Sequence, residues 1–299
     1  MKHIQEFSSF LNEQETRLAP NKENPIDGFA DLLRSAKDIF TSAGFLPEDP
    51  ENGIGWGGRL GNNQSKVPTE EEVKKGVAAV NAAMDRHKIT DKKMRASIQG
   101  VIGKECGWVP RSETPYNNTP NDRIRKVFGK RVDSLNDAEL NSLKANANKF
   151  WDRVYGPNDP TGTSQKNGNT NPGDGAKYLG RGFNGVTFKS GYEKIQKLYD
   201  EYNKLGKSIN FVSNPNSLND IDVAAEVAVI YFLDGIKNPK VKSMYGSNDP
   251  NKFSNKDTAL KAVFHTNAGL GKDINKSFFR DTLAKAADFR DDMLSKNMV

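Results

Sequence analysis

The sequence predicts a mainly α-helical fold with long ordered loops, preceded by an N-terminal arm. Apolar residues recur at intervals of three and four in several segments after residue 67, which is the spacing of one helix face. Segments that alternate apolar and polar residues, as half-buried strands do, are few. Turn-forming residues gather at 20–66, 106–122 and 156–191, so we place the regular domain at 67–299.

We interpret the first 66 residues as an arm and a linker. A short helix is expected at 1–19, and a second helical segment, "DGFADLLRSAKDIFTSAGF", lies between turn-rich stretches. Trp56, within "GIGWGG", is either a platform on which a sugar stacks or an anchor of the linker, and we favour the anchor.

The domain should begin with two capped helices. Thr69 followed by Glu72 has the spacing of a capping box, in which each side chain bonds the backbone N–H of the other residue. Thr90 is the expected cap of the next helix. Further helices are expected at 136–155, 190–206, 220–236, 257–269 and 275–296, and the one at 220–236 is apolar on nearly all sides, which indicates a central buried helix.

Size and composition restrict the class of protein. The chain has 299 residues and a net charge of +6, and 35% of its residues are hydrophobic, which is compatible with a globular protein. It has no apolar run long enough to span a membrane, no secretory signal, and one cysteine, Cys106, which excludes an internal disulfide. No zinc, P-loop or nucleic-acid motif is present, so we expect no metal, no cofactor and no nucleic-acid partner.

The most informative segment is "SIQGVIGKECGWVPRSETPYNNTP", residues 97–120. The spacing of its apolar residues places Glu105 on the buried face of a helix that ends at Gly107. A carboxyl turned inward beside Trp108 would lose hydration, and its pKa should rise until it can donate a proton near neutral pH. The alternative is that Glu105 faces water at the helix end or pairs with a Lys or Arg.

A second carboxylate, Glu113, follows eight residues later, across a turn that contains Pro110. Hydrolysis of a glycosidic bond uses two carboxyl groups on either side of the sugar. The tract "TPYNNTP" adds hydroxyl and amide groups suited to holding a water molecule and sugar hydroxyls. The spacing alone is a weak indication, because many loops carry a Glu.

Four segments, taken in order, resemble the glycoside hydrolase family 19 fold that chitinases and many phage endolysins use. "KECGWVPRSETPYNNTPNDRIRKVFGKRV" is similar to the active-site segment of that family, and "FWDRVYG" to its "F…VY" segment. "GNTNPGDGAKYLGRGFNGVTFKSGY" resembles its "GDG…Y.GRG" segment, and "FHTNAGLG" its C-terminal segment. The resemblance covers about residues 70–290 and implies a lysozyme-like domain of the family 19 chitinase type.

The resemblance implies a role for each carboxylate. Glu105 matches the general acid, and Glu113 matches the base that activates a water molecule on the opposite face of the sugar. An inverting mechanism is then expected, with the two carboxyl groups roughly 6.5–9.5 Å apart. Thr119, or an Asn at 117 or 118, would position the water. The predicted substrate-binding residues are Trp108, Tyr116, Asn117, Thr119, Lys177, Tyr178, Arg181, Thr187, Tyr192 and Asn267.

The chain departs from the family at two places. Gly185 stands where Gln is usual, so an amide that would contact the sugar or a catalytic Glu is lost. Cys106 stands where Ser or Thr is common, and we expect a small buried side chain without thiol chemistry.

Three other polar residues carry more than one interpretation. The fork of donors on Arg181 suits sugar hydroxyls or a carboxylate of the peptide stem, or an ion pair with one of the two candidate catalytic glutamates. Glu226, in the most apolar helix, and His265, near a helix end, are expected to be structural.

The first residues, "MKHIQEFSSFLNEQE", resemble the capsid-targeting peptides of T-even-type phages. Those begin with Met-Lys, contain "EF", and end in Leu/Ile-x-Glu, after which a prohead protease cuts. Cleavage would then fall between Glu13 and Gln14, and the protein would be packed inside the virion. The alternative is an amphipathic helix that docks on its own domain.

These features together predict a monomeric peptidoglycan hydrolase that cleaves β-1,4 bonds of the murein glycan strand. It would be made in the host cytoplasm and act from the virion or in the bacterial periplasm and cell wall, with phage capsid proteins as further partners and with no membrane association. Its positive charge would favour an anionic wall. The alternatives are a virion structural or glycan-binding protein with weak or no turnover, and a chitinase, although chitinases usually carry signal peptides and disulfides.

Overall fold

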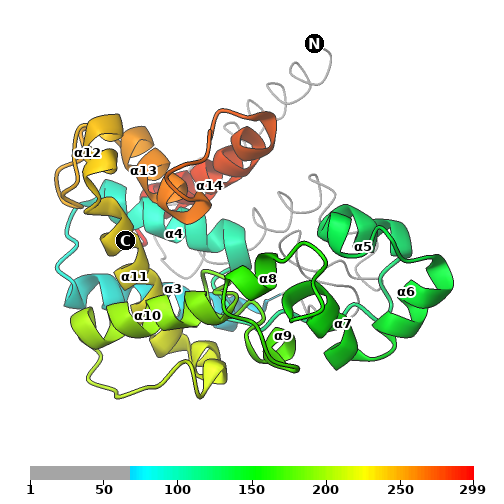
Figure 1. Ribbon diagram of the computed structural model, residues 1–299. Helices are drawn as coiled ribbons and strands as arrows, with labels where there is room; N and C mark the ends of the chain where they lie inside the picture. The colour runs from blue at the N-terminus through cyan, green and yellow to red at the C-terminus, as the bar shows by residue number, and fades with distance from the viewer. Residues whose placement is uncertain (1–67) are drawn as a thin grey trace, which may run out of the picture.

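Residues 68–299 are described by the computed structural model, and they are mainly helical, as the sequence predicts (Figure 1). Within this range the β-type pairing is confined to one isolated antiparallel bridge between Arg181 and Val186. No helix of this range has the length and hydropathy needed to cross a membrane. The expected helix at 1–19, Trp56 and the Glu13–Gln14 cleavage site lie outside the described residues.

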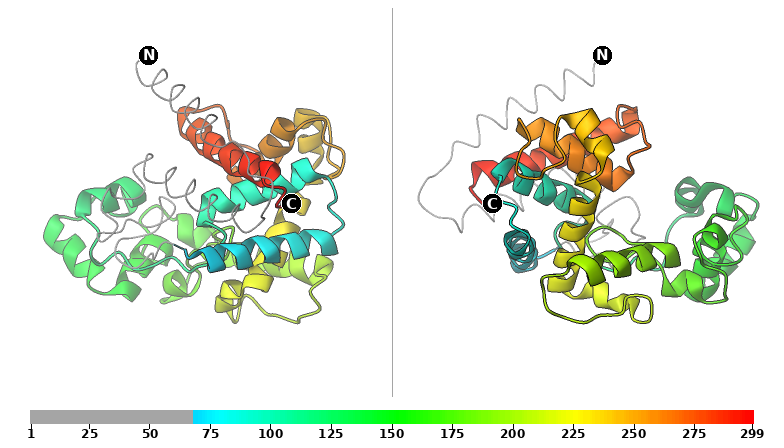
Figure 2. Two further views of the ribbon diagram at one scale, coloured as in Figure 1. Left: turned by 180° about the vertical axis from the view of Figure 1, so that it is seen from behind. Right: turned by 60° about the vertical axis from the view of Figure 1, so that its left-hand side comes forward.

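The helices form two lobes, and the smaller lobe stands apart from the larger one in Figures 1 and 2. The larger lobe contains α3 (Glu70–Arg86), α4 (Lys92–Cys106), α10 (Lys189–Tyr202), α11 (Ile221–Ile236), α12 (Pro239–Tyr245), α13 (Lys256–Ala268) and α14 (Ser277–Ser295). The smaller lobe contains α5 (Asn121–Phe128), η2 (Gly129–Arg131), α6 (Asp137–Lys144) and α7 (Ala147–Tyr155). The loops contain α8 (Thr163–Lys166), α9 (Asp174–Lys177) and η3 (Pro215–Asn219).

Local sequence explains where the first helices begin. The capping box of Thr69 and Glu72 is present at the start of α3, which confirms that prediction. The predicted cap of α4, Thr90, is wrong by one residue. The carboxylate of Asp91 accepts hydrogen bonds from the first N–H groups of α4, while the Thr90 N–H and hydroxyl bond Asn251 instead.

The single helix predicted at 136–155 is two helices, α6 and α7. The side chain of Asn146 accepts a hydrogen bond from the Lys149 N–H and so begins a new helix there. The short helix α12 was not predicted, and it begins with Pro239 in its first turn.

Each lobe has its own apolar core. In the larger lobe α4 packs against α13 and α14, and α11 packs against α3 and is buried on most sides, as predicted. In the smaller lobe the core is a set of aromatic rings in edge and stacked contacts. That set includes Tyr116, Phe128, Phe150, Trp151 and Tyr155. The tyrosines at 116 and 155 are therefore held firmly, which matters for the site described below.

Glu226 is a fully buried carboxylate that joins α3 to α11. Its oxygens accept hydrogen bonds from Arg86 Nε at 2.9 Å, His87 Nε2 at 2.7 Å and the Lys204 N–H at 2.7 Å. Burial alone would raise the pKa of Glu226, but the hydrogen bonds from His87, Lys204 and Arg86 outweigh it and hold the pKa below the ordinary value of 4.5. Glu226 is thus structural, as expected.

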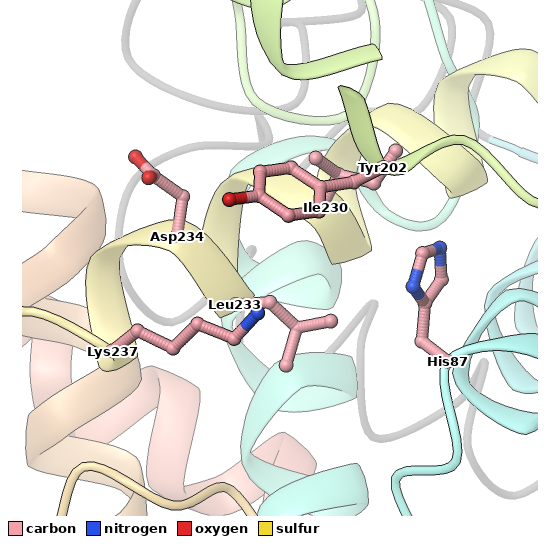
Figure 3. Close-up of a pocket in the computed structure, with 6 residues that line it drawn as sticks. All are labelled: His87, Tyr202, Ile230, Leu233, Asp234 and Lys237. Carbon is pink, nitrogen blue, oxygen red and sulfur yellow. The ribbon is translucent and has the colours of Figure 1, made fainter. Parts of the chain in front are cut away.

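A small cavity of about 30 Å³ lies beside this network (Figure 3). The side chains around it come from α10, α11 and the residue after α3, and the Lys237 ammonium lies 4.9 Å from the centre of the Tyr202 ring. The volume admits water but not a sugar ring. The lining residues are His87, Tyr202, Ile230, Leu233, Asp234 and Lys237.

Replacing the buried carboxylate should destabilise the domain in a pH-dependent way. We expect Glu226→Gln to lower the free energy of unfolding by about 3 kcal/mol at neutral pH, because it leaves Arg86 and His87 without their charge partner. Since the pKa of Glu226 is lowered on folding, this contribution is complete above pH 4.5 and shrinks as the pH falls through the folded-state value. Urea unfolding at several pH values measures both effects.

The matched control is Glu193→Gln, because Glu193 is half exposed and lies 3.9 Å from Lys189 on the same helix. That change should cost at most about 0.5 kcal/mol. Equal losses for the two variants would contradict the structural role assigned to Glu226.

Candidate functional site

Glu105 lies in the last turn of α4, at the boundary between the core and solvent. Its side chain is 31% exposed, and its Oε1 accepts hydrogen bonds from Lys104 Nζ and Asn267 Nδ2, each at 3.0 Å. The expectation that this carboxyl turns into the core is wrong, and the alternative of pairing with a lysine describes the structure. Asn267 comes from the end of α13, and its predicted contact with substrate stays a prediction.

Trp108 is fully buried and cannot touch a substrate in this structure, so its predicted binding role is wrong. Its indole N–H donates to Gln99 Oε1 at 2.7 Å, and its ring meets Phe289 edge-on. A Cβ added to Gly103 would lie 2.4 Å from the indole, so the ring fits only because that position is glycine. The buried indole of Trp108 anchors the segment that leads to Glu113.

Glu113 is held in one orientation by two tyrosines. It is 8% exposed, and its Oε1 accepts hydrogen bonds from Tyr116 Oη and Tyr155 Oη, each at 3.1 Å. Its backbone N–H donates to Gly180 O at 2.8 Å. Tyr116 therefore orients the carboxylate instead of contacting substrate as predicted. Tyr155 was missed, although it belongs to the "FWDRVYG" segment that carries part of the resemblance.

The other oxygen of Glu113 packs against Gly180. A Cβ added to Gly180 would lie 3.3 Å from Glu113 Oε2 and 3.4 Å from Thr187 Oγ1. The carboxylate oxygen and the Thr187 hydroxyl thus lie close together beside Gly180. The predicted contact of Thr187 with substrate stays a prediction.

Arg181 is a structural anchor, and both roles predicted for it are wrong. It is 7% exposed, and its guanidinium donates to Lys177 O at 2.7 Å, to Tyr192 Oη at 3.0 Å and to Asn216 Oδ1 at 3.0 Å. Within residues 68–299 none of its hydrogen-bond partners is a carboxylate. Its donors close the loop around the Arg181–Val186 bridge, so few remain for a ligand.

Two further predicted binding residues are buried behind this loop. Tyr192 is fully buried, its hydroxyl donates to Leu179 O at 2.8 Å, and burial raises its pKa to about 12. Tyr178 is 2% exposed, and its hydroxyl donates to Val212 O at 3.2 Å. Neither can contact substrate as the structure stands. Lys177 is exposed, with its ammonium 5.0 Å from the centre of the Tyr178 ring.

The residues after Tyr116 form a tight turn. The Thr119 N–H donates to Tyr116 O at 3.0 Å, and Thr119 O accepts from Lys144 Nζ at 2.7 Å. Asn117 is exposed, whereas Thr119 is almost completely buried. Both border an open polar hollow on the smaller lobe. Their predicted contact with substrate stays a prediction.

Backbone geometry accounts for the departure at Gly185. This residue closes the turn after the Arg181–Val186 bridge with φ at 59°, in the left-handed region, which side chains other than glycine rarely adopt. No atom lies within 4 Å of a Cβ added there. The turn therefore favours glycine. A larger side chain at position 185 would have space, but its backbone would be strained at this φ angle.

Cys106, beside Glu105, is a partly buried thiol. Burial, and then the charge of Glu105, raise its pKa to about 12, and its Sγ lies 3.3 Å from Ile102 O. A thiol that stays protonated is a poor nucleophile.

The Cys106 thiol should therefore resist modification in the native protein. We expect no reaction with an aromatic disulfide reagent at mildly alkaline pH, and full reaction after guanidinium unfolding. Absorbance of the released thiolate measures both. Rapid labelling of the native protein would show that the thiol is accessible and ionised.

No protein-family model matches this chain, and no curated protein matches it. Residues 68–299 contain no group of three or more His, Cys, Asp or Glu side chains placed to hold a metal ion.

Proposed function

We propose that the protein is a peptidoglycan hydrolase with a lysozyme-like domain of the family 19 type, which cleaves β-1,4 glycosidic bonds of the murein glycan strand. The observation that carries the proposal is the contrast between two carboxylates on either side of one bend. Glu105 is partly exposed beside Lys104 and Asn267, whereas Glu113 is buried and oriented by two tyrosines. Glycosidases use two carboxyl groups in different environments, and the assignment of Glu105 as the acid and Glu113 as the base follows the resemblance.

In the proposed mechanism each carboxylate has one task. Glu105 donates a proton to the leaving oxygen of the glycosidic bond, and the Asn267 amide fixes the orientation of its carboxyl group. Glu113 accepts a proton from the attacking water molecule, and Thr187, whose hydroxyl lies near Glu113 beside Gly180, contacts the same water. The water attacks the sugar carbon from the opposite face in one step, which inverts its configuration.

We propose that the enzyme acts during phage infection. The net charge of +6 favours adhesion to an anionic cell wall. The resemblance of the first 15 residues to capsid-targeting peptides supports packaging in the virion and action at infection.

Removing the acid should abolish hydrolysis without unfolding the domain. We expect wild-type protein to clear a suspension of outer-membrane-stripped Gram-negative cells, and Glu105→Gln to lower the rate by a factor on the order of 10² or more. Turbidity measures the rate, circular dichroism checks the fold, and Glu193→Gln is the control with full activity. Undiminished clearing by Glu105→Gln would remove Glu105 from its role.

If neither wild type nor Glu105→Gln clears the cells although both are folded, the protein is a glycan-binding or structural component without turnover. Gly185 is then the first residue to test, because it lacks the side-chain amide that a Gln would provide at that position.

The stereochemistry of the product tests the single-step mechanism separately. Direct attack by water on a β-linked sugar should release the α-anomer first, which proton NMR of a soluble glycan oligomer detects before mutarotation. An initial β-anomer would instead indicate a covalent intermediate and refute the role given to Glu113.

A further inference from the structure

A polar hollow of about 400 Å³ lies on the smaller lobe, and neither Glu113 nor Gly180 lines it. One wall is the loop after Tyr116 with the start of α5, and the other is α6. The volume is within the range of small-molecule binding sites, roughly 300–1,000 Å³. Six of its lining residues matter here: Asn117, Asn118, Asn121, Asp137, Asn141 and Lys144.

Lys144 forms the base of the hollow. Lys144 is only 7% exposed, and its ammonium donates a hydrogen bond to Thr119 O at 2.7 Å. An ammonium has three N–H donors, so this hydrogen bond does not use its full capacity. A buried lysine that borders a hollow is a strong donor for an oxygen atom placed there.

Asn121 offers a complementary group. Its amide N–H bonds the Asp137 carboxylate, whereas its Oδ1 is buried and has no hydrogen-bond partner within the described part of the chain. A buried acceptor without a donor is uncommon in native proteins and marks a place where a ligand or water belongs. Helix α5 also begins here without a side-chain cap, so its first N–H groups add donors.

We propose that this hollow is an accessory binding site for a neutral sugar unit of the glycan strand, an inference that rests on the proposed function. The lining mixes amide and ammonium donors with carboxylate and amide acceptors, and a hydroxyl group can serve both kinds. The carboxylates of Asp122 and Asp137 are balanced by Arg125 and by the Lys144 ammonium, so the charges around the hollow cancel and favour a neutral ligand. An N-acetylated sugar has the hydroxyl and acetamido groups that this lining matches.

The hollow shares a loop with the candidate catalytic base. Tyr116 orients Glu113 through its hydroxyl, and three residues later Thr119 is held by Lys144. A sugar bound between Asn118 and α6 therefore presses on the loop that positions Glu113. The site would hold the strand and steady the base at the same time.

The test measures binding apart from hydrolysis, with the full chain in a Glu105→Gln background. The probe is the neutral tetramer of N-acetylglucosamine, and calorimetry gives its dissociation constant. Asn118→Ala combined with Asn141→Ala removes two exposed amides without disturbing the core. Asn148→Ala is the matched control, because Asn148 is exposed on α7 in the same lobe and does not line the hollow.

We expect the double variant to bind the tetramer about tenfold more weakly, the loss of two hydrogen bonds, and Asn148→Ala to bind like the parent. Equal affinity of the double variant and the parent overturns the accessory site and leaves the hydrolase proposal intact. A parent that binds no tetramer, in a protein that clears no cells, overturns both.

Discussion

The burial of Trp108 is the constraint on which the candidate site depends. Gly107 and Trp108 both adopt left-handed backbone angles, with φ at 61° and 58°, and the indole then enters the core between α3 and α4. Gly76 and Gly103 make room, since a Cβ on either would collide with Trp108. A tryptophan of this size contributes several kcal/mol through burial, enough to fix a strained turn. The segment that follows is thereby aimed so that Glu113 meets Gly180.

Two of the buried carboxylates in the described residues, Glu226 and Glu113, differ in the groups that hydrogen-bond to them. Glu226 is hydrogen-bonded to the Arg86 guanidinium and the His87 ring, which satisfy its oxygens and join two helices. Glu113 accepts hydrogen bonds from two neutral phenol groups on one oxygen, while its other oxygen packs against Gly180 near the Thr187 hydroxyl. The first arrangement favours a charged, structural group. In the second, two tyrosines fix the orientation of the carboxylate, as a base that must exchange a proton requires.

Features set by near neighbours were predictable, and features set by long-range packing were not. The Thr69 cap depends on residues three apart, and the buried faces of α3, α4 and α11 follow from periodicity. Arg181 and Tyr192 are residue types that bind sugars and also close loops, and only their burial decides between the two uses. Tyr155 lies 42 residues from Glu113 in the chain, so no local pattern places the two together.

Within residues 68–299 each lobe contains one tryptophan, so intrinsic fluorescence can report on each lobe. Trp108 emits from a dry core and should fluoresce at short wavelength. Trp151 lies stacked on Tyr155, with ring centres 5.8 Å apart, so its emission is sensitive to the ring that orients Glu113. Exchanging either indole for phenylalanine would separate the signals. Unfolding of the larger lobe and loosening of the smaller one then become distinguishable events in a single fluorescence experiment.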